Sequence, residues 1–152
     1  MSLSRDFVEF IECLISRQVD YLLVGGHALA FHGLPRFTKD IDFWVRPTAE
    51  NAEKILLALD DFGFSKIGLT AEDFTIPGRV VQLGQPPNRI DLLTSIDGVK
   101  FDLAFSRRVE SEYMGSRLWV IGKEELIENK RSTGRKQDLL DVGMLTGGDP
   151  TI

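Results

Sequence analysis

Apolar residues follow two patterns along the chain, namely helical spacing in some segments and short continuous runs in others. In residues 5–18 they recur every three or four positions, which predicts an amphipathic helix. The runs 21–24 and 41–45 are short and apolar, and each is bounded by glycine or polar residues, which predicts buried strands. The same patterns predict strands at 79–83, 89–93, 109–113 and 117–121, and helices at 27–33, 48–62, 101–105, 123–131 and 136–146.

Helices interspersed with short strands predict an α/β (α+β) fold, with one central sheet flanked by helices. The 109–113 and 117–121 strands are expected to form a hairpin around Met114 and Gly115. A chain of 152 residues suits a single domain, 1–152, and is long enough to bury a core without disulfides. A composition of 43% hydrophobic and 27% charged residues is typical of globular proteins and argues against disorder.

Charge and cysteine content exclude some functions. A net charge of -5 argues against a protein that coats nucleic acid non-specifically, although it permits a local basic site. The single cysteine, Cys13, allows no disulfide within the chain. Neither a signal peptide nor an apolar stretch of membrane-spanning length is recognisable, so we expect a cytoplasmic protein without a membrane partner.

Two aspartates interrupt the second predicted strand. Asp40 and Asp42 are two positions apart, so on a strand they share one face, with Cα atoms ~6.6 Å apart. Carboxylates on one face repel each other unless a cation lies between them, and oxygen ligands favour Mg²⁺ or Mn²⁺. The alternative is that Asp40 only begins the strand, or that both side chains face solvent.

A third acid, Asp91, lies in the apolar stretch "RIDLL". A lone buried aspartate is costly unless it is paired or bound to a cation. If its strand lies beside the strand of Asp40 and Asp42, three carboxylates converge, and three acids can hold two metal ions for phosphoryl or nucleotidyl transfer. The alternative for Asp91 is an ion pair with Arg89 or Arg36.

Gly25 and Gly26 end the first predicted strand and open a helix, which lets backbone N–H groups approach an anion. A double glycine alone is most often only a turn. Neither the dinucleotide-binding Gly-x-Gly-x-x-Gly pattern nor a P-loop is present in the sequence.

The combination of these features resembles the nucleotidyltransferase fold shared with DNA polymerase beta. "VGG" at 24–26 is followed, after thirteen residues, by "DIDF" at 40–43, and Asp91 resembles the third carboxylate of that superfamily. "RFTKDID" at 36–42 and "EELIENKRSTGRKQDLLDV" at 124–142 are similar to the small bacterial branch that contains minimal nucleotidyltransferases and the nucleotidyltransferase toxins of abortive-infection systems. The second glycine, Gly26, stands where many members have serine.

The resemblance implies roles for these residues. Gly25 and Gly26 would hold the triphosphate of an NTP, and the three aspartates would bind Mg²⁺ (or Mn²⁺). Asp91 would also help to activate an acceptor hydroxyl, which would attack the α-phosphorus and release pyrophosphate. Lys130 would face the phosphates, and Asp138 would orient that lysine or the substrate.

Several other side chains are candidates for the nucleotide site. His27 follows the glycines and could reach a phosphate, but a hydrogen bond to backbone is an equal alternative. Arg36 and Lys39 precede the aspartates and would pair with them without metal. Arg135 is a candidate for the phosphates, whereas Asp141 is expected at the surface. Each of them lies close in sequence to the glycine turn, the strand aspartates or the last predicted helix.

Three functions remain open at this point. The leading hypothesis is a nucleotidyltransferase whose acceptor is an RNA end, a protein or a small molecule. The second is a non-catalytic nucleotide-binding or antitoxin-like partner with the same fold, and the third is a metal-dependent phosphodiesterase. A toxin–antitoxin partner or a homodimer is compatible with the resemblance.

Overall fold

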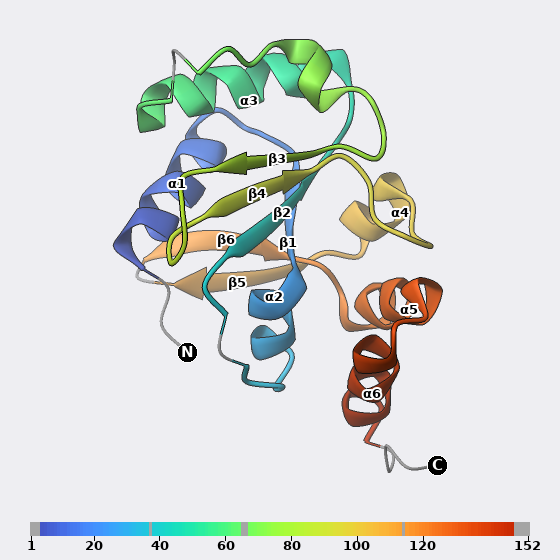
Figure 1. Cartoon of the computed structure of the whole chain (residues 1–152). Helices are drawn as coiled ribbons and strands as arrows, with labels where there is room; N and C mark the ends of the chain where they lie inside the picture. Colours follow the sequence, from blue (N-terminus) through green and yellow to red (C-terminus); the bar gives the residue numbers. More distant parts are fainter. Residues whose placement is uncertain (1–3, 37, 65–66, 114, 148–152) are drawn as a thin grey trace.

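Strands from both halves of the sequence form one mixed sheet at the centre of the fold (Figure 1). The computed structural model describes residues 4–36, 38–64, 67–113 and 115–147. Within these ranges the strands are β1 (Tyr21–Val24), β2 (Ile41–Val45), β3 (Val80–Leu83), β4 (Ile90–Leu93), β5 (Val109–Tyr113) and β6 (Ser116–Val120). Their order in the sheet is β3-β4-β2-β1-β6-β5.

The strand directions combine parallel and antiparallel pairs. β2 runs antiparallel to β1 and parallel to β4, while β6 runs parallel to β1. β3 and β5 are the edge strands, and each is antiparallel to its neighbour. The predicted mixed sheet and the β5–β6 hairpin are therefore confirmed, although Met114 at the hairpin turn lies outside the described residues.

The helices surround this sheet. They are α1 (Arg5–Ser16), α2 (Gly25–Phe31), α3 (Ala49–Phe62), the 3-10 helix η1 (Ala71–Phe74), α4 (Phe101–Ser106), α5 (Lys123–Thr133) and α6 (Lys136–Leu145). α1 packs against α3, and α5 packs against α6. Figure 1 shows α2, α5 and α6 gathered at one end of the molecule, where β1 runs into α2.

Local sequence explains where these elements begin and end. The Thr48 side chain caps α3 by accepting a hydrogen bond from the backbone N–H of Asn51, and Gly63 ends it with φ of 104°. All four residues of β1 are buried, because the sheet is covered on both faces, and this accounts for its continuous apolar sequence. The predicted helices at both ends of the chain are confirmed.

Two helix boundaries differ from the sequence predictions for a local reason. α1 ends at Ser16 instead of residue 18, because Gln18 adopts a left-handed φ of 58°. α2 begins at Gly25 instead of residue 27, directly where β1 ends. The η1 helix falls in a stretch that carries no strong periodic pattern. Among the described residues, no helix combines the length and apolar character needed to cross a bilayer.

Candidate active site

Two of the predicted acids lie side by side in the sheet. β2 and β4 are parallel neighbours, and their register places Asp42 directly opposite Asp91. Asp40 lies immediately before β2, one residue upstream of Ile41. The condition for convergence, that the two acid-bearing strands be adjacent, is therefore met.

The side chain of Arg89 connects Asp40 and Asp91. Its Nε lies 2.9 Å from Oδ1 of Asp91, and its Nη2 lies 3.1 Å from Oδ2 of the same carboxylate. Nη2 also lies 2.9 Å from Oδ2 of Asp40. One guanidinium therefore bridges Asp40 and Asp91, which realises the ion-pair alternative for Asp91 through Arg89.

Asp42 carries the most perturbed carboxyl group of the site. Burial, followed by the charge and a hydrogen bond of the neighbouring Asp91 carboxyl, raises the pKa of Asp42 to about 7. The charge of Arg89 only partly opposes this rise. The environment of Asp42 thus disfavours the ionised form of its carboxyl group beside the carboxylate of Asp91.

The strand acids meet only some of the requirements of a site for an oxygen-liganded divalent cation. Oδ1 of Asp40 is shielded from solvent and has no hydrogen-bond partner among the described residues. Carboxylate oxygens such as those of Asp40 and Asp42 are the ligands that Mg²⁺ and Mn²⁺ prefer. Within the described ranges, however, no group of three or more acidic, histidine or cysteine side chains is arranged to hold one metal ion.

Gly25 is required by the close approach of Asp42. It has a left-handed φ of 72°, and a Cβ at this position would lie 2.2 Å from Oδ2 of Asp42. A Cβ on Gly26 would meet the Cβ of Thr38 at 3.2 Å, so a larger residue would crowd the loop before Asp40. The double glycine therefore lets the β1–α2 turn pack directly against the acidic strand.

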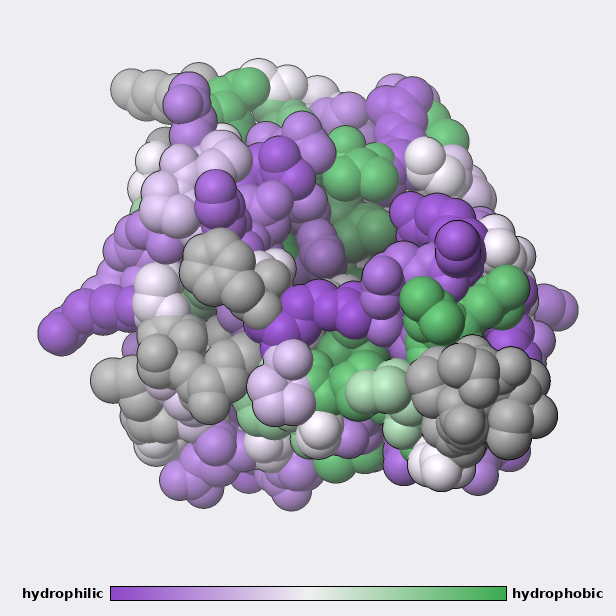
Figure 2. Space-filling view, turned by 60° about the horizontal axis from the view of Figure 1, so that its bottom comes forward, coloured by the Kyte–Doolittle hydropathy of each residue, from purple (hydrophilic) through white to green (hydrophobic). Residues whose placement is uncertain are grey.

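A cavity of about 300 Å³ lies between the ends of the strands and the C-terminal helices. It is lined by Val24, Gly25, Asp42, Leu93, Ser95, Ile96, Asp97, Asn129, Thr133 and Arg135. Figure 2 brings this end of the molecule forward, and hydrophilic residues predominate around the middle of the view. The cavity thus brings together the predicted residues Gly25, Asp42 and Arg135.

Sequence reasoning missed four polar residues of this cavity. Ser95 and Asp97 follow β4, and Asn129 and Thr133 lie on α5. Asn129 donates from Nδ2 to the carbonyl of Asp97 at 2.9 Å, which ties α5 to the loop after β4. Short polar residues after a strand or on a helix surface are typical of solvated positions and give no signal of a site. Only the closeness of Ser95 and Asp97 to Asp91 in the sequence could have pointed to them.

Lys130 is buried in an ionic cluster instead of lining the cavity. Its Nζ lies 3.0 Å from Oδ1 of Asp138 and 2.9 Å from Oδ2 of Asp141. The expectation that Asp141 lies at the surface is wrong, because only 1% of the residue is exposed. The helical spacing of Asp138 and Asp141 directs both carboxylates towards the same ammonium group.

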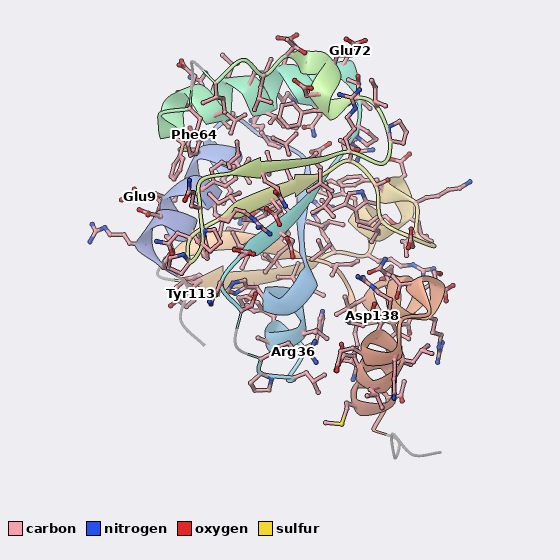
Figure 3. The ribbon with its side chains drawn as sticks, in the orientation of Figure 1. Glu9, Arg36, Phe64, Glu72, Tyr113 and Asp138 are labelled. Atoms are coloured by element: carbon pink, nitrogen blue, oxygen red, sulfur yellow. The ribbon has the colours of Figure 1, made fainter. Side chains whose placement is uncertain are left out.

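Arg36 belongs to this cluster and not to the acids of the sheet. Its Nη1 and Nη2 donate to the two carboxylate oxygens of Asp141 at 3.0 and 2.5 Å. The expectation that Arg36 pairs with the strand aspartates is therefore wrong. Figure 3 shows Arg36 beside α2 and Asp138 beside the C-terminal helices, on the two sides of this junction. The pair fastens the loop after α2 to α6.

Asp138 accepts hydrogen bonds from both ends of the turn between α5 and α6. Thr133 Oγ1 donates to its Oδ2 at 2.6 Å, and Arg135 Nε donates to the same oxygen at 2.9 Å. Asp138 also contacts the ammonium group of Lys130. This carboxylate therefore holds two residues of the cavity wall, Thr133 and Arg135, in place.

The remaining candidates lie away from the cavity wall. His27 is buried, and its ring packs edge-on against Phe7 with centroids 5.8 Å apart. Burial lowers the pKa of His27, and the Asp40 backbone opposes this shift. Lys39 is exposed in the loop before Asp40. Neither residue lines the cavity that contains Asp42.

Comparison with known proteins supports the fold. Neither a known family model nor a curated protein matches the sequence at the significance required. The structure is similar to the crystal structure of a candidate nucleotidyltransferase from Thermotoga maritima, with a TM-score of 0.61 and 16% sequence identity. The superposition covers 94% of this chain and 91% of that chain. The chain therefore adopts the nucleotidyltransferase fold, in which the paired strand acids and the glycine turn meet.

Proposed function

We propose that this protein is a metal-dependent nucleotidyltransferase, which moves a nucleoside monophosphate from an NTP to an acceptor hydroxyl and releases pyrophosphate. The observation that carries the proposal is the register of Asp42 opposite Asp91, beside a cavity that Gly25 also lines. The nucleotidyltransferase fold supports the same assignment. We also propose that the protein belongs to the small bacterial branch that the motifs at 36–42 and 124–142 resemble.

The strand acids form the catalytic centre in this proposal. Asp40, Asp42 and Asp91 offer carboxylate oxygens, and Mg²⁺ or Mn²⁺ held by them would supply Lewis-acid polarisation and charge neutralisation at the phosphates. The acceptor oxygen forms a bond to the α-phosphorus while the bond to the bridging oxygen of the pyrophosphate breaks. Asp91 takes the proton of the acceptor hydroxyl, since it lies beside Asp42 in the sheet.

The glycine turn and the α5–α6 junction bind the nucleotide. Gly25 and Gly26 let the backbone of the β1–α2 turn approach the triphosphate closely, because no side chain intervenes. Arg135 lines the cavity and supplies positive charge to the phosphates. Lys130 contributes at longer range, and Asp138 positions Arg135 and Lys130 together.

A second function is favoured by one specific observation. Arg89 already pairs with both Asp40 and Asp91, and Lys130 pairs with Asp138 and Asp141. A protein that binds a nucleotide without transferring it, including an antitoxin-like partner, needs no free cation at this place. The two functions differ in one measurable product, because only the enzyme forms a bond between the nucleotide and an acceptor.

The test is label transfer from each NTP radiolabelled at the α-phosphate, with Mg²⁺ or Mn²⁺, to cellular RNA, cellular protein and a small-molecule extract in separate reactions. The proposal predicts label in one acceptor class, release of pyrophosphate, and loss of both products in Asp42→Ala. Asp60→Ala, on the exposed face of α3, is the matched control and is expected to keep activity. Nucleotide binding without transfer to any class would favour the non-catalytic function.

A further inference from the structure

Arg135 is held at the cavity wall through one of its three side-chain nitrogens. Its Nε donates to Oδ2 of Asp138 at 2.9 Å, whereas neither terminal nitrogen has a partner among the described residues. The side chain of Arg135 is 77% exposed, and the residue lines the cavity that also contains Asp42. A guanidinium held in this way keeps its terminal N–H groups available for an anion such as a phosphate.

Asp138 is itself fixed by a chain of ion pairs that leads away from the cavity. Nζ of Lys130 lies 3.0 Å from Oδ1 of Asp138 and 2.9 Å from Oδ2 of Asp141. Arg36 donates from its two terminal nitrogens to the two carboxylate oxygens of Asp141, at 3.0 and 2.5 Å. These contacts form one continuous ion-pair network, whose members are Arg36, Asp141, Lys130, Asp138 and Arg135.

We propose that Arg36 and Asp141 are positioning residues for nucleotide binding, which act through this network to hold Arg135 in the orientation that binds the phosphates of the NTP. The inference rests on the proposed nucleotidyltransferase function. It assigns a role to two residues that do not line the cavity.

The middle of the network is buried and its cavity end is exposed. Lys130 and Asp141 are both buried, and the side chain of Asp141 is only 2% exposed. A buried charge that loses its partner is costly, so these groups keep a fixed geometry relative to each other. Order is therefore built into the interior of the network, and the solvent-exposed guanidinium of Arg135 is the part that an anion can reach.

Arg36 gives the network a surplus of positive charge. Three cationic side chains face the two carboxylates of Asp138 and Asp141. Because Arg36 binds both oxygens of Asp141, Lys130 is shared with Asp138 and weakens the hold of Asp138 on the charge of Arg135. Without Arg36 the remaining charges would balance, and the cavity wall would attract phosphate less strongly.

Arg36 also fastens α6 to the rest of the protein. Within the described residues, the hydrogen bonds that connect α6 with the chain before α5 all come from Arg36. Asp138 lies in the first turn of α6, and Arg135 directly precedes that helix. Figure 3 shows Arg36 and Asp138 on the two sides of this junction. A change at Arg36 should therefore alter the placement of the helix start that carries Arg135.

The first measurement needs no nucleotide. Exchange of the Arg135 Nε–H with solvent is followed by nitrogen-15 NMR, and the signal is assigned by its loss in Arg135→Gln. We expect exchange at least about tenfold faster in Arg36→Gln than in the wild type, because the hydrogen bond to Asp138 opens more often. Arg36→Lys keeps the charge but loses the two-bond fork, so exchange should be about threefold faster.

The second measurement is the KM for the NTP in the transfer assay described above. Arg36→Gln should raise KM at least about fivefold and leave kcat within about twofold, because Arg36 contacts neither the strand acids nor the acceptor. In the double variant with Arg135→Gln, KM should stay within about twofold of Arg135→Gln alone, since both changes remove the same contact. A residue that only stabilises the fold would give independent effects that multiply.

The matched control is Arg17→Gln, since Arg17 also binds an aspartate, Asp61, with two hydrogen bonds but has no link to the network. It should leave exchange and KM unchanged. Wild-type exchange of the Arg135 Nε–H in Arg36→Gln or in Arg36→Lys would overturn the inference, and so would multiplying effects on KM. If the wild type neither binds nor transfers any nucleotide, the proposed function fails, whereas the exchange measurement still decides whether Arg36 holds Arg135.

Discussion

Asp42 and Asp91 face each other across the parallel strands β2 and β4. These residues are far apart in sequence, and the pairing of their strands alone brings their carboxyl groups together. The arrangement raises the pKa of Asp42 to about 7, chiefly through burial and then through Asp91. Such a cost is retained in proteins mainly where carboxylates serve a cation or a reaction.

The glycine turn should be sensitive to the smallest addition. Gly25→Ala places a methyl group against Asp42 and strains a left-handed backbone, so we expect a lower free energy of unfolding and weaker Mn²⁺ binding. Gly33→Ala is the matched control, because Gly33 also has a left-handed φ, of 93°, but has no atom within 4 Å of the added Cβ. Urea denaturation and Mn²⁺ titration of both variants measure the difference.

Gly33→Ala is expected to cost about 1–2 kcal/mol from backbone strain alone and to leave Mn²⁺ affinity unchanged. Gly25→Ala should be destabilised by more than this. Equal Mn²⁺ affinity in Gly25→Ala and the wild type would show that the turn does not support the acidic centre.

The buried Asp141 should make the free energy of unfolding depend on pH in the acidic range. Burial alone would raise the pKa of Asp141, but hydrogen bonds from Arg36, Lys130 and Gln137 outweigh it and lower the pKa to about 2. A depressed pKa in the folded state adds stability above the unfolded value of 3.8, and this stability is lost as the pH falls towards 2. The contribution at neutral pH is about 2 kcal/mol.

Asp141→Asn tests this contribution by chemical denaturation at several pH values. The variant should be less stable than the wild type at pH 7, and the difference should shrink as the pH falls below about 4. Glu110→Gln removes an exposed surface pair with Arg117 and is expected to change stability by less than about 1 kcal/mol. A difference for Asp141→Asn that is constant with pH would contradict the ionic account.

Arg135 and Arg131 are alike in chemistry but lie in different environments. Arg135 lines the cavity, whereas Arg131 is exposed on α5. In steady-state transfer assays, Arg135→Gln should raise the KM for the NTP by about tenfold or more, because a charge-assisted contact to phosphate is lost. Arg131→Gln should leave KM within about twofold of the wild type, since an exposed charge contributes little. Similar KM values for the two variants would remove Arg135 from the nucleotide site.

The elements and the acid-bearing strands could be predicted from local pattern. The run 21–24 is buried at every position, and the alternation of acids with Ile41 and Phe43 indicates a strand with one polar face. The spacing of Asp40 and Asp42 and the isolated Asp91 pointed to the same centre. Local sequence carries these signals because they depend on neighbours in the chain.

Long-range partners could not be predicted in the same way. Arg36 lies four residues before Asp40, yet it binds Asp141, more than a hundred residues away. Asn129 and Thr133 reach the cavity only because α5 packs at the end of the sheet. Lys130 and Arg131 are adjacent and chemically alike, and only the packing of α6 determines that one is buried and the other exposed.

The proposed function requires the strand acids to bind a nucleotide together with a divalent ion. Isothermal titration with a non-hydrolysable NTP analogue, with and without Mg²⁺, tests it in the wild type, Asp42→Ala and Asp60→Ala. We predict Mg²⁺-dependent binding to the wild type and Asp60→Ala, and binding at least about tenfold weaker to Asp42→Ala. Equal affinity in the wild type and Asp42→Ala, unaffected by Mg²⁺, would show that the strand acids do not form a metal-dependent nucleotide site.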